Sequence, residues 1–411
     1  MAWLLLPLQD APPGLALFNP SVVQYGGSYY AATRSLEKKQ IGEIEWWLSG
    51  AHLCKADGNQ PSFKGSSCNL FDPWKDRNLS YSDCIKPPLK PGEKKPKKQR
   101  DAKGIEDPKL FVWPGKGVYA TYNRKPHIKD PKRPLCDKFG FVQYMSTVVY
   151  DAEPPGREDP WHLQAPVQLC AGQFSKDIYK KDSRYVKEKN WMPFIHEGEL
   201  YFTHSIMPHR VFKVNVTGIA VQQWVSVARE LLPDEFLQAP KSHMHGGPPV
   251  VLVGSSASGT GKPYYLGVMH YWDMPRMPGA RAYHHYAYQM EAQPPFRICA
   301  VSKELPLRRY DSTIHAGVKA NMWTRDINFV SGLQLVDDNK TVHMSYGAFD
   351  TDARMLSMTL TDLESHFVED FDCSRSRVVK VGAGRGKPGK EAAAGQRSAA
   401  AADGSREHVR Q

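Results

Sequence analysis

Five segments of the chain repeat one pattern of apolar and polar positions. Each has a start marked by Pro or Gly, a short apolar run, a tight turn, and an aromatic-rich run that ends in polar residues. Short apolar runs joined by turn residues are typical of β-hairpins. The predicted hairpins begin at Asn19, Asp107, Trp191, Pro248 and Val330. Their turns are predicted at Gly26-Gly27, 114–117, Glu197-Gly198, near Gly259 and at 337–339.

The spacing of these hairpins predicts an all-β fold. Their starts lie 88, 84, 57 and 82 residues apart, which leaves room for a four-stranded sheet and variable loops in each repeat. One sheet cannot bury both of its faces alone, so we expect five sheets to stack radially as a five-bladed β-propeller. A β-sandwich is the alternative, but it does not explain why polar residues recur at the same place in each repeat.

In a propeller the residues before and after each first hairpin converge on a central cavity. We therefore expect the recurring polar residues to meet there: Asn19, Arg34, Asp107, Asn123, Lys189, Asn190, His204, His270 and Asp350. Residues 1–17 are interpreted as a leader, 18–368 as the propeller and 369–411 as a disordered tail. Long insertions at 48–104 and 126–136 are expected to reshape the cavity.

The net charge of the chain does not change the predicted fold. The chain has 54 Lys and Arg against 43 Asp and Glu, but much of the excess lies in the Pro-rich stretch 86–103 and in the tail. We interpret both as solvated segments, not as a specific nucleic-acid surface. No run approaches the roughly 18 apolar residues that span a bilayer. Nothing in the sequence indicates an oligomeric state.

The cysteines and glycosylation sequons favour an oxidising compartment, and so the secretory-pathway lumen over the cytoplasm. Cysteines at positions 54, 68 and 84 lie close enough in sequence for one disulfide, and no C-x-x-C pair indicates a zinc site. The sequons stand at Asn78, Asn215 and Asn339.

Two aspartates are the candidate catalytic acids. Pro108 is expected to keep Asp107 extended at a strand start, and nearby aromatic residues would raise its pKa toward the range of a general acid. Asp350 is predicted to lie across the cavity, and two facing carboxylates are the usual equipment of glycosyl transfer. Asp350 and Asp352 also form an Asp-x-Asp, but without a nucleotide-binding unit we predict no metal.

Cationic and imidazole groups predict a second subsite, for an oxyanion such as phosphate. Its candidate ligands are Lys109, His204, Arg210 and His270. We assign His243, His245, His284 and His285 to packing or the surface because their spacing fits no common metal site. The chain has no nucleophile-elbow, P-loop or dinucleotide-binding motif, so no cofactor is predicted, and inorganic phosphate is the candidate co-substrate.

Several short motifs together resemble glycoside hydrolase family 130. They are Asn19-Pro20, Arg34, Glu106-Asp107-Pro108, Lys189-Asn190 followed by Trp-x-Pro-Phe, His270, and Tyr-Gly-Ala-x-Asp ending at Asp350. That family consists of five-bladed propellers that act on β-mannosides, mostly as phosphorylases, and is similar to a family of protozoan mannosyltransferase/phosphorylases. The resemblance implies an enzyme that cleaves or forms β-mannosidic linkages of an oligosaccharide or glycan.

The resemblance also implies roles for individual residues. Asp107 resembles the general acid, which in that family acts by way of a sugar hydroxyl. His270 resembles part of the phosphate site, together with Tyr283 or Tyr286. The expected substrate-binding residues are Asn19, Arg34, Asn123, Lys189, Asn190, Trp191 and Tyr346, with Asp350 also at the cleavage subsite.

Two departures leave the nucleophile open. This chain has Lys109 where the family has arginine, and His204-Ser205 where it has a His-Arg pair, which weakens phosphate binding. Phosphate, water or a sugar hydroxyl would make the enzyme a phosphorylase, a hydrolase or a transferase. Water would need a carboxylate base, for which Asp350 and Glu291 are candidates. A non-catalytic propeller that binds glycans or proteins is the competing interpretation.

Overall fold

The structure, a computed structural model, is dominated by strands. It describes residues 2–5, 15–41, 44–58, 61–63, 68–71, 100–124, 142–150, 161–163, 166–178, 190–232, 244–273, 282–307, 327–348, 352–368 and 370–379. All of them belong to one compact unit, Met1–Val379. Within these ranges the only α-helices are α1 (Ser175–Ile178) and α3 (Leu360–Glu364). No helix in this part of the chain is long and apolar enough to cross a membrane.

The strands form five sheets, which we number as blades. Blade one contains β2 (Leu15–Tyr25), β3 (Ser28–Ile41), β4 (Ile44–Asp57), β5 (Cys68–Leu70) and β6 (Arg100–Lys103). Blade two contains β7 (Glu106–Trp113), β8 (Gly117–Arg124), β9 (Val142–Tyr150), β10 (Trp161–Leu163) and β11 (Val167–Gln168). Blade three contains β12 (Met192–His196), β13 (Glu199–Ile206), β14 (His209–Val214), β15 (Ala220–Val227) and β24 (Arg377–Val378).

The last two blades follow the same plan. Blade four contains β16 (Met244–Gly246), β17 (Val251–Val253), β18 (Tyr264–Asp273), β19 (Ala282–Glu291) and β20 (Ile298–Glu304). Blade five contains β21 (Asn328–Val336), β22 (Thr341–Ala348), β23 (Asp352–Thr359) and β1 (Ala2–Leu5). Neighbouring strands are antiparallel, except that β6 runs parallel to β4.

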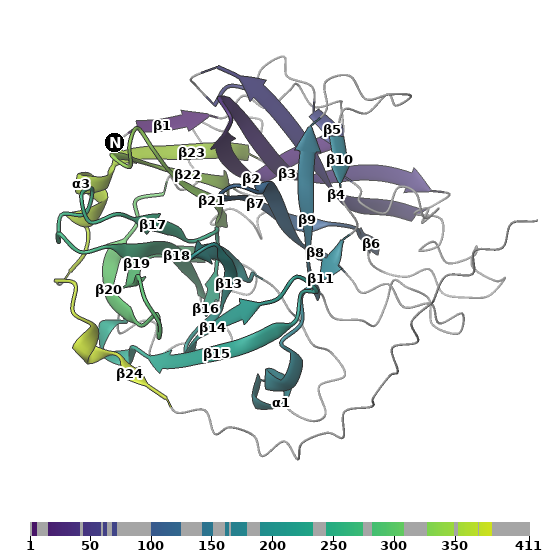
Figure 1. The fold of residues 1–411 in the computed structure, drawn as a ribbon. Coiled ribbons are helices and arrows are strands. Elements are labelled where there is room, and N and C mark those ends of the chain that lie inside the picture. Colours follow the sequence, from purple (N-terminus) through teal and green to yellow (C-terminus); the bar gives the residue numbers. More distant parts are fainter. Residues whose placement is uncertain are drawn as a thin grey trace, which may run out of the picture. The chain divides into compact units, whose positions relative to one another are not determined.

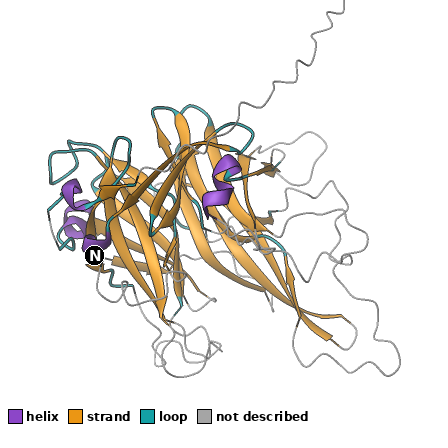
Figure 2. Ribbon diagram, turned by 90° about the horizontal axis from the view of Figure 1, so that it is seen from below, coloured by secondary structure: helices purple, strands orange, loops and turns teal. Residues whose placement is uncertain are grey.

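The five blades close into a ring (Figures 1 and 2). Contacts between blades run from β2 to β7, from β7 to β12, from β13 to β16, from β17 to β21, and from β21 back to β2. The predicted five-bladed β-propeller is therefore confirmed. All five predicted hairpins are present, and several turn residues have the left-handed φ that Gly, Asn and Asp adopt most easily, such as Gly26 (57°) and Asn339 (66°).

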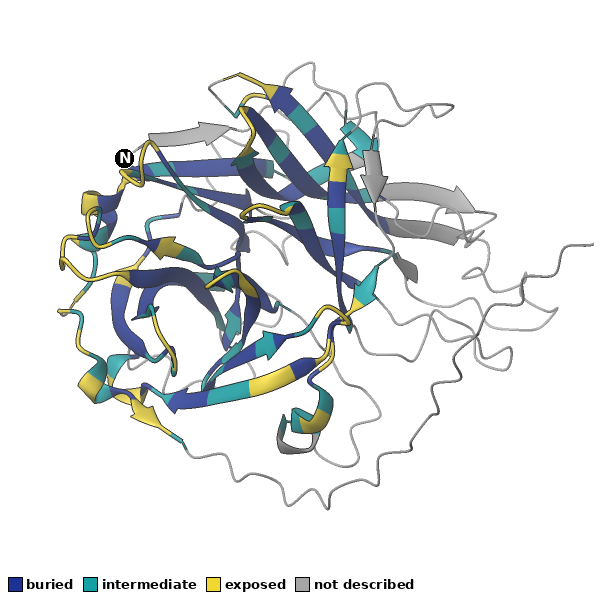
Figure 3. Cartoon of the chain, in the orientation of Figure 1, coloured by how far each residue is buried: buried dark blue, intermediate teal, exposed yellow. Residues whose placement is uncertain are grey.

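The apolar core is divided among the interfaces between neighbouring blades. One cluster joins blades one and two, for example Leu53 with Leu110, and four similar clusters fill the other four interfaces. Figure 3 shows buried residues along the strands and exposed residues at the turns. Because the apolar side chains pack between blades, polar side chains can occupy the ends of the strands nearest the axis.

Both predicted ends of the propeller have to be corrected. β1, inside the predicted leader 1–17, pairs with β23, and β2 already begins at Leu15. β24, inside the predicted tail 369–411, pairs with β15. Each of these strands covers the outer edge of a blade, where an unpaired row of backbone groups would otherwise remain. Residues 380–411 lie outside the described residues.

Two disulfides hold outer parts of the propeller together. Cys54–Cys68 joins β4 to β5, and it uses two of the three cysteines from which a disulfide was predicted; Cys84 lies outside the described residues. Cys299–Cys373, which was not predicted, joins β20 to the 3-10 turn Cys373–Arg375 just before β24. Partners 74 residues apart carry no local signal in the sequence.

Removing the Cys299–Cys373 disulfide is expected to destabilise the protein. We expect the double variant Cys299→Ala, Cys373→Ala to lose about 2–4 kcal/mol of unfolding free energy, because the unfolded chain regains the freedom of a long loop. Denaturant unfolding under non-reducing conditions measures the change. The control is Cys170→Ser, which alters an exposed free thiol. Equal stability of the two variants would contradict the prediction.

Candidate active site

Three blades have a polar residue in an unusual backbone conformation within the first strand or just before it. Asn19, Asp107 and Asn190 have φ of 51°, 49° and 64°. The extended conformation predicted for Asp107 is therefore wrong. The register of β2 and β7 skips residues at these points, between Phe18 and Ser21 and between Glu106 and Lys109. Such bulges re-aim side chains, and Asn and Asp tolerate the left-handed region better than most residues.

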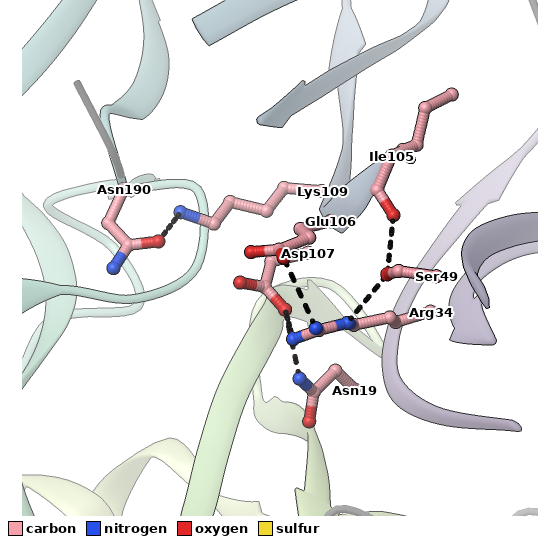
Figure 4. Close-up of polar contacts among 8 residues, drawn as sticks. All are labelled: Asn19, Arg34, Ser49, Ile105, Glu106, Asp107, Lys109 and Asn190. Atoms are coloured by element: carbon pink, nitrogen blue, oxygen red, sulfur yellow. Dashed lines mark hydrogen bonds and ion pairs between the residues drawn. The ribbon is translucent and has the colours of Figure 1, made fainter. Parts of the chain in front are cut away.

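The Asp107 carboxylate is held by two donors from blade one (Figure 4). Asn19 Nδ2 donates to Asp107 Oδ1 at 3.0 Å, and Arg34 Nη1 donates to the same oxygen at 3.3 Å. Asp107 itself is only 8% exposed. Figure 4 shows its second oxygen directed away from Arg34. Asn19, Arg34 and Asp107 are thus brought together as predicted from the fold.

Arg34 links this aspartate to a second carboxylate. Its Nη2 lies 3.4 Å from Glu106 Oε1, and its Nε donates to Ser49 Oγ at 3.3 Å. Ser49 Oγ in turn donates to the carbonyl oxygen of Ile105 at 3.1 Å. The two buried carboxylates therefore share one guanidinium, whose orientation is set by hydrogen bonds.

Glu106 is a site residue that the sequence analysis missed. Consecutive side chains in a regular strand point to opposite faces, so Glu106 and Asp107 would not be expected to share a partner. The bulge and the left-handed Asp107 bring both to Arg34. The sequence contained one signal, since Glu106 belongs to the Glu-Asp-Pro motif.

Lys109 brings a positive charge to the same region. Its side chain is fully buried, and its Nζ donates to Asn190 Oδ1 at 3.3 Å. The ammonium also lies 6.0 Å from the centre of the Phe329 ring. Asn190 belongs to the start of blade three and Phe329 to blade five, so this lysine connects three blades. In Figure 4 the carboxylate of Asp107 lies between Lys109 and Arg34.

His270 forms the blade-four side of the site. Its ring stacks on Tyr283 with centroids 4.9 Å apart and lies 5.5 Å from Phe329. Two further imidazoles, His285 and His245, have centroids 5.5 Å and 5.8 Å away. Burial, followed by these two histidines and Lys109, holds the pKa of His270 well below its usual range. The neutral ring has one nitrogen, Nδ1, that bonds no described residue.

This cluster bears on two expectations. The tyrosine beside His270 is Tyr283, whereas Tyr286 is buried in the cluster between blades three and four. His285 is buried, in agreement with its assignment to packing, and His245 is half-buried; both rings flank His270. Positions on adjacent strands become neighbours through register, which the spacing of histidines along the chain does not reveal.

Two other predicted site residues are buried between the blades. Trp191 is fully buried and packs on Phe202 and Phe212, with His204 against the same ring, so it offers no platform to a sugar. Tyr346 is fully buried in the cluster between blades four and five. These side chains fill the interfaces because a propeller needs large aromatics between its blades.

The remaining candidates lie at different places in the blades. Asn123 is fully buried directly across the β7–β8 pair from Glu106. Arg210 lies on β14, the third strand of its blade, opposite Ser205. Glu291 accepts hydrogen bonds from Arg297 Nε at 3.0 Å and Nη2 at 2.5 Å, at the end of β19 away from His285, so it is no candidate base. Lys189 and Asp350 lie outside the described residues.

The motif that precedes Asp350 nevertheless contacts the site. A Cβ added at Gly347 would collide with the side chain of Asn19, so this position needs glycine. Gly347 stands opposite Phe329 in the β21–β22 pair. Blade five therefore contacts the site that contains Asn19, Asp107 and Lys109.

Two buried histidines make stability sensitive to acid. Burial lowers the pKa of His209 and of His285 to about 3. Because the unfolded chain binds protons near pH 6.5, their contribution to stability is complete above that pH and is lost as the pH falls toward about 3. Each is expected to lower the unfolding free energy by about 1.4 kcal/mol per pH unit in that window.

The variant His209→Gln removes one of these two histidines and leaves His285 in place. His209 lies between blades three and four, near Tyr288. We expect the difference in unfolding free energy between the wild-type protein and this variant to shrink as the pH falls from about 6.5 to about 4. Denaturant titrations at several pH values measure it. Parallel pH curves for the two proteins would contradict the assignment.

Comparisons with known proteins give structural matches only. No family model matches the chain, and no curated protein matches its sequence. The structure is similar to β-1,2-mannobiose phosphorylase from Listeria innocua, with 12% identity, 86% of this chain and 93% of that chain covered, and a TM-score of 0.49. It is also similar to a mannose phosphorylase from Leishmania mexicana, with 13% identity, 90% and 92% covered, and a TM-score of 0.44.

A third similar structure comes from work on glycoside hydrolases of the GH130 family of mannoside phosphorylases, which target β-1,2-mannosidic linkages in Candida mannan. Its identity is 14%, the covered shares are 84% of this chain and 85% of that chain, and the TM-score is 0.46.

Proposed function

We propose that this protein is a carbohydrate-active enzyme that cleaves or forms β-mannosidic linkages with inversion. The observation that carries the proposal is the group of Asp107, Arg34 and Glu106, which is assembled with Asn19 from the first two strands of blade one and the first strand of blade two. A buried aspartate with fixed orientation is suited to proton transfer. The sequence motifs that supply these residues are those that resemble β-mannoside phosphorylases.

In this proposal Asp107 protonates the leaving glycosidic oxygen by way of a sugar hydroxyl. Asn19 and Arg34 fix one carboxylate oxygen, so that the other is presented to the sugar. Arg34 is itself oriented by Ser49 and Glu106, which limits the rotamers available to the catalytic group. A nucleophile that enters on the face of the sugar opposite the acid produces inversion.

Phosphate is the nucleophile that the site favours. Lys109 supplies a buried cation, and neutral His270 supplies an imidazole nitrogen beside Tyr283. Ammonium and imidazole groups both donate to phosphate oxygens. Hydrolysis would need a carboxylate base. Of the two predicted candidates, Glu291 is bound to Arg297, and Asp350 lies outside the described residues. A lectin-like role is disfavoured because the side chain of Trp191, an expected substrate-binding residue, is buried.

The proposal is tested by product analysis. A β-1,2-linked mannobiose is incubated with the protein and with phosphate, with water alone, or with an acceptor sugar. We expect phosphate-dependent formation of α-mannose 1-phosphate, whose anomeric configuration is read by NMR. Free mannose alone would indicate hydrolysis, and phosphate-independent longer oligosaccharides would indicate transfer. No turnover of any β-mannoside under the three conditions would overturn the enzyme proposal.

Lys109 is expected to determine phosphate affinity. Replacing it with Met should raise the KM for phosphate roughly 10- to 100-fold, which corresponds to the loss of one charge-assisted hydrogen bond. Lys116→Met is the matched control, because Lys116 is exposed in the turn at the other end of the same strand and stacks on Trp113. Initial rates at varied phosphate measure the effect. An unchanged KM in a folded Lys109→Met variant would exclude Lys109 from the phosphate site.

A further inference from the structure

Two N-x-Thr sequences of the described chain lie outside the candidate site. They are Asn215-Val216-Thr217, in the turn between β14 and β15, and Asn339-Lys340-Thr341, in the turn between β21 and β22. This pattern is the acceptor for N-linked glycans in surface loops of secreted proteins.

Both turns lie at the ends of the blades opposite the candidate site. β12 begins next to Asn190, and because the strands alternate in direction, β14 also runs away from the site and ends at the turn with Asn215. β21 begins near Phe329, beside His270, and runs away to the turn with Asn339. A large group attached at either turn therefore leaves the site open.

The local structure at Asn215 is that of an exposed polar turn. Its Oδ1 accepts hydrogen bonds from the Thr217 hydroxyl at 2.8 Å, from Thr217 N at 3.1 Å and from Ile219 N at 2.9 Å. The acceptor oxygen is thus fully used, whereas Nδ2, the atom that receives a glycan, bonds no described residue. Asn215 is half-buried, whereas Asn339 is exposed, in a turn of three consecutive residues with left-handed φ.

Three exposed apolar residues lie close to Asn215 in the sequence. Val216 is 83% exposed, Val221 is 47% exposed and Ile219 is 44% exposed. Exposed apolar groups that form a contiguous patch mark a surface that something covers. A glycan on Asn215 is bulky and solubilising, and it would extend over these side chains.

The disulfides give an independent indication of the compartment. Cys54–Cys68 and Cys299–Cys373 are stable in oxidising surroundings such as the lumen of the secretory pathway. N-linked glycans are added to proteins of the same pathway. The sequons in exposed turns and the disulfides therefore both indicate the secretory pathway.

We propose that Asn215 and Asn339 carry N-linked glycans on the face opposite the candidate site. In the transfer, Nδ2 of asparagine forms a bond to C1 of the first sugar of a lipid diphosphate-linked oligosaccharide. The bond between C1 and the diphosphate oxygen breaks, the lipid diphosphate leaves with the electron pair, and one amide proton is released. No oxidant or reductant is required. The inference does not depend on the enzymatic reaction proposed above.

The test is mass spectrometry of the full chain expressed from its complete gene in eukaryotic cells. Treatment with peptide N-glycosidase in ¹⁸O-water converts each glycosylated asparagine into ¹⁸O-labelled aspartate. We expect the label at positions 215 and 339. Label only elsewhere in the chain, or none at all in the folded protein, would overturn the proposal.

Two variants at Thr217 distinguish loss of the glycan from an effect of the substitution on folding. Thr217→Ala removes the acceptor pattern and keeps Asn215, so the glycan at 215 should be lost while that at 339 remains. Thr217→Ser keeps the hydroxyl and should keep the glycan. Because both positions are remote from the candidate site, enzymatic deglycosylation should leave β-mannoside turnover unchanged. Retention of the modification at 215 in the Thr217→Ala variant would contradict the assignment.

Discussion

Asp107→Asn is expected to lower kcat for a β-mannoside by about 10²–10⁴-fold, the usual contribution of a general acid. The change is nearly isosteric, and the Asn19 amide can still donate to the side-chain oxygen at position 107. The amide cannot deliver a proton to the leaving oxygen. Substrate binding, measured by calorimetry, should therefore remain while turnover is lost.

A substrate with an activated aryl leaving group makes this test specific for proton donation. Such a leaving group needs little protonation, so the loss caused by Asp107→Asn should shrink markedly with it. Asp338→Asn is the matched control, because Asp338 is exposed in the β21–β22 turn. An equal loss with activated and ordinary leaving groups would assign Asp107 to binding or positioning instead of acid catalysis.

Arg34→Met is expected to cost about 3–5 kcal/mol of unfolding free energy, because removal of one partner leaves buried charges uncompensated. Arg34 is the cation shared by Glu106 and Asp107, whose side chains are mostly buried. The variant forces two carboxylates to remain close together without their shared guanidinium. Denaturant unfolding measures the stability, and turnover should fall with it, since Asp107 loses one of its two orienting donors.

A second substitution distinguishes charge repulsion from lost packing. Adding Glu106→Gln to Arg34→Met removes one of the two negative charges, so part of the lost stability should return. Lys213→Met is the control, because its ion pair with Glu199 is more exposed and is expected to contribute about 0–1 kcal/mol. A loss for Arg34→Met no larger than that of Lys213→Met would show that the buried cation is not needed.

Local residue chemistry was sufficient to predict the hairpins. Gly26, Gly198 and Asn339 occupy left-handed turns that few other residue types adopt, and the apolar runs beside them can form only short strands. The repeat of that pattern then predicted the number of blades. It also predicted that Asn19 and Asp107, 88 residues apart, would meet, because each stands at the start of a first strand.

The role of a side chain that depends on packing between blades could not be predicted from the local sequence in this way. Trp191 and Tyr346 are aromatic residues of the kind that can stack on a sugar, but both are buried. Whether an aromatic ring faces a ligand or a neighbouring blade depends on how two sheets pack against each other. The choice between Tyr283 and Tyr286 depended on strand register, since a shift of one residue reverses the face that a side chain occupies.

The sequence determines the hairpins and the number of blades, because turn conformation and alternation are properties of neighbouring residues. Only the tertiary structure decides that Glu106 joins Asp107 at Arg34, that Lys109 reaches Asn190 and that histidines from two strands flank His270. A single bulge in β7 and the order of docking around the ring set these contacts. The bulge and the packing of the blades depend on interactions between distant parts of the chain, so a local sequence pattern does not predict them.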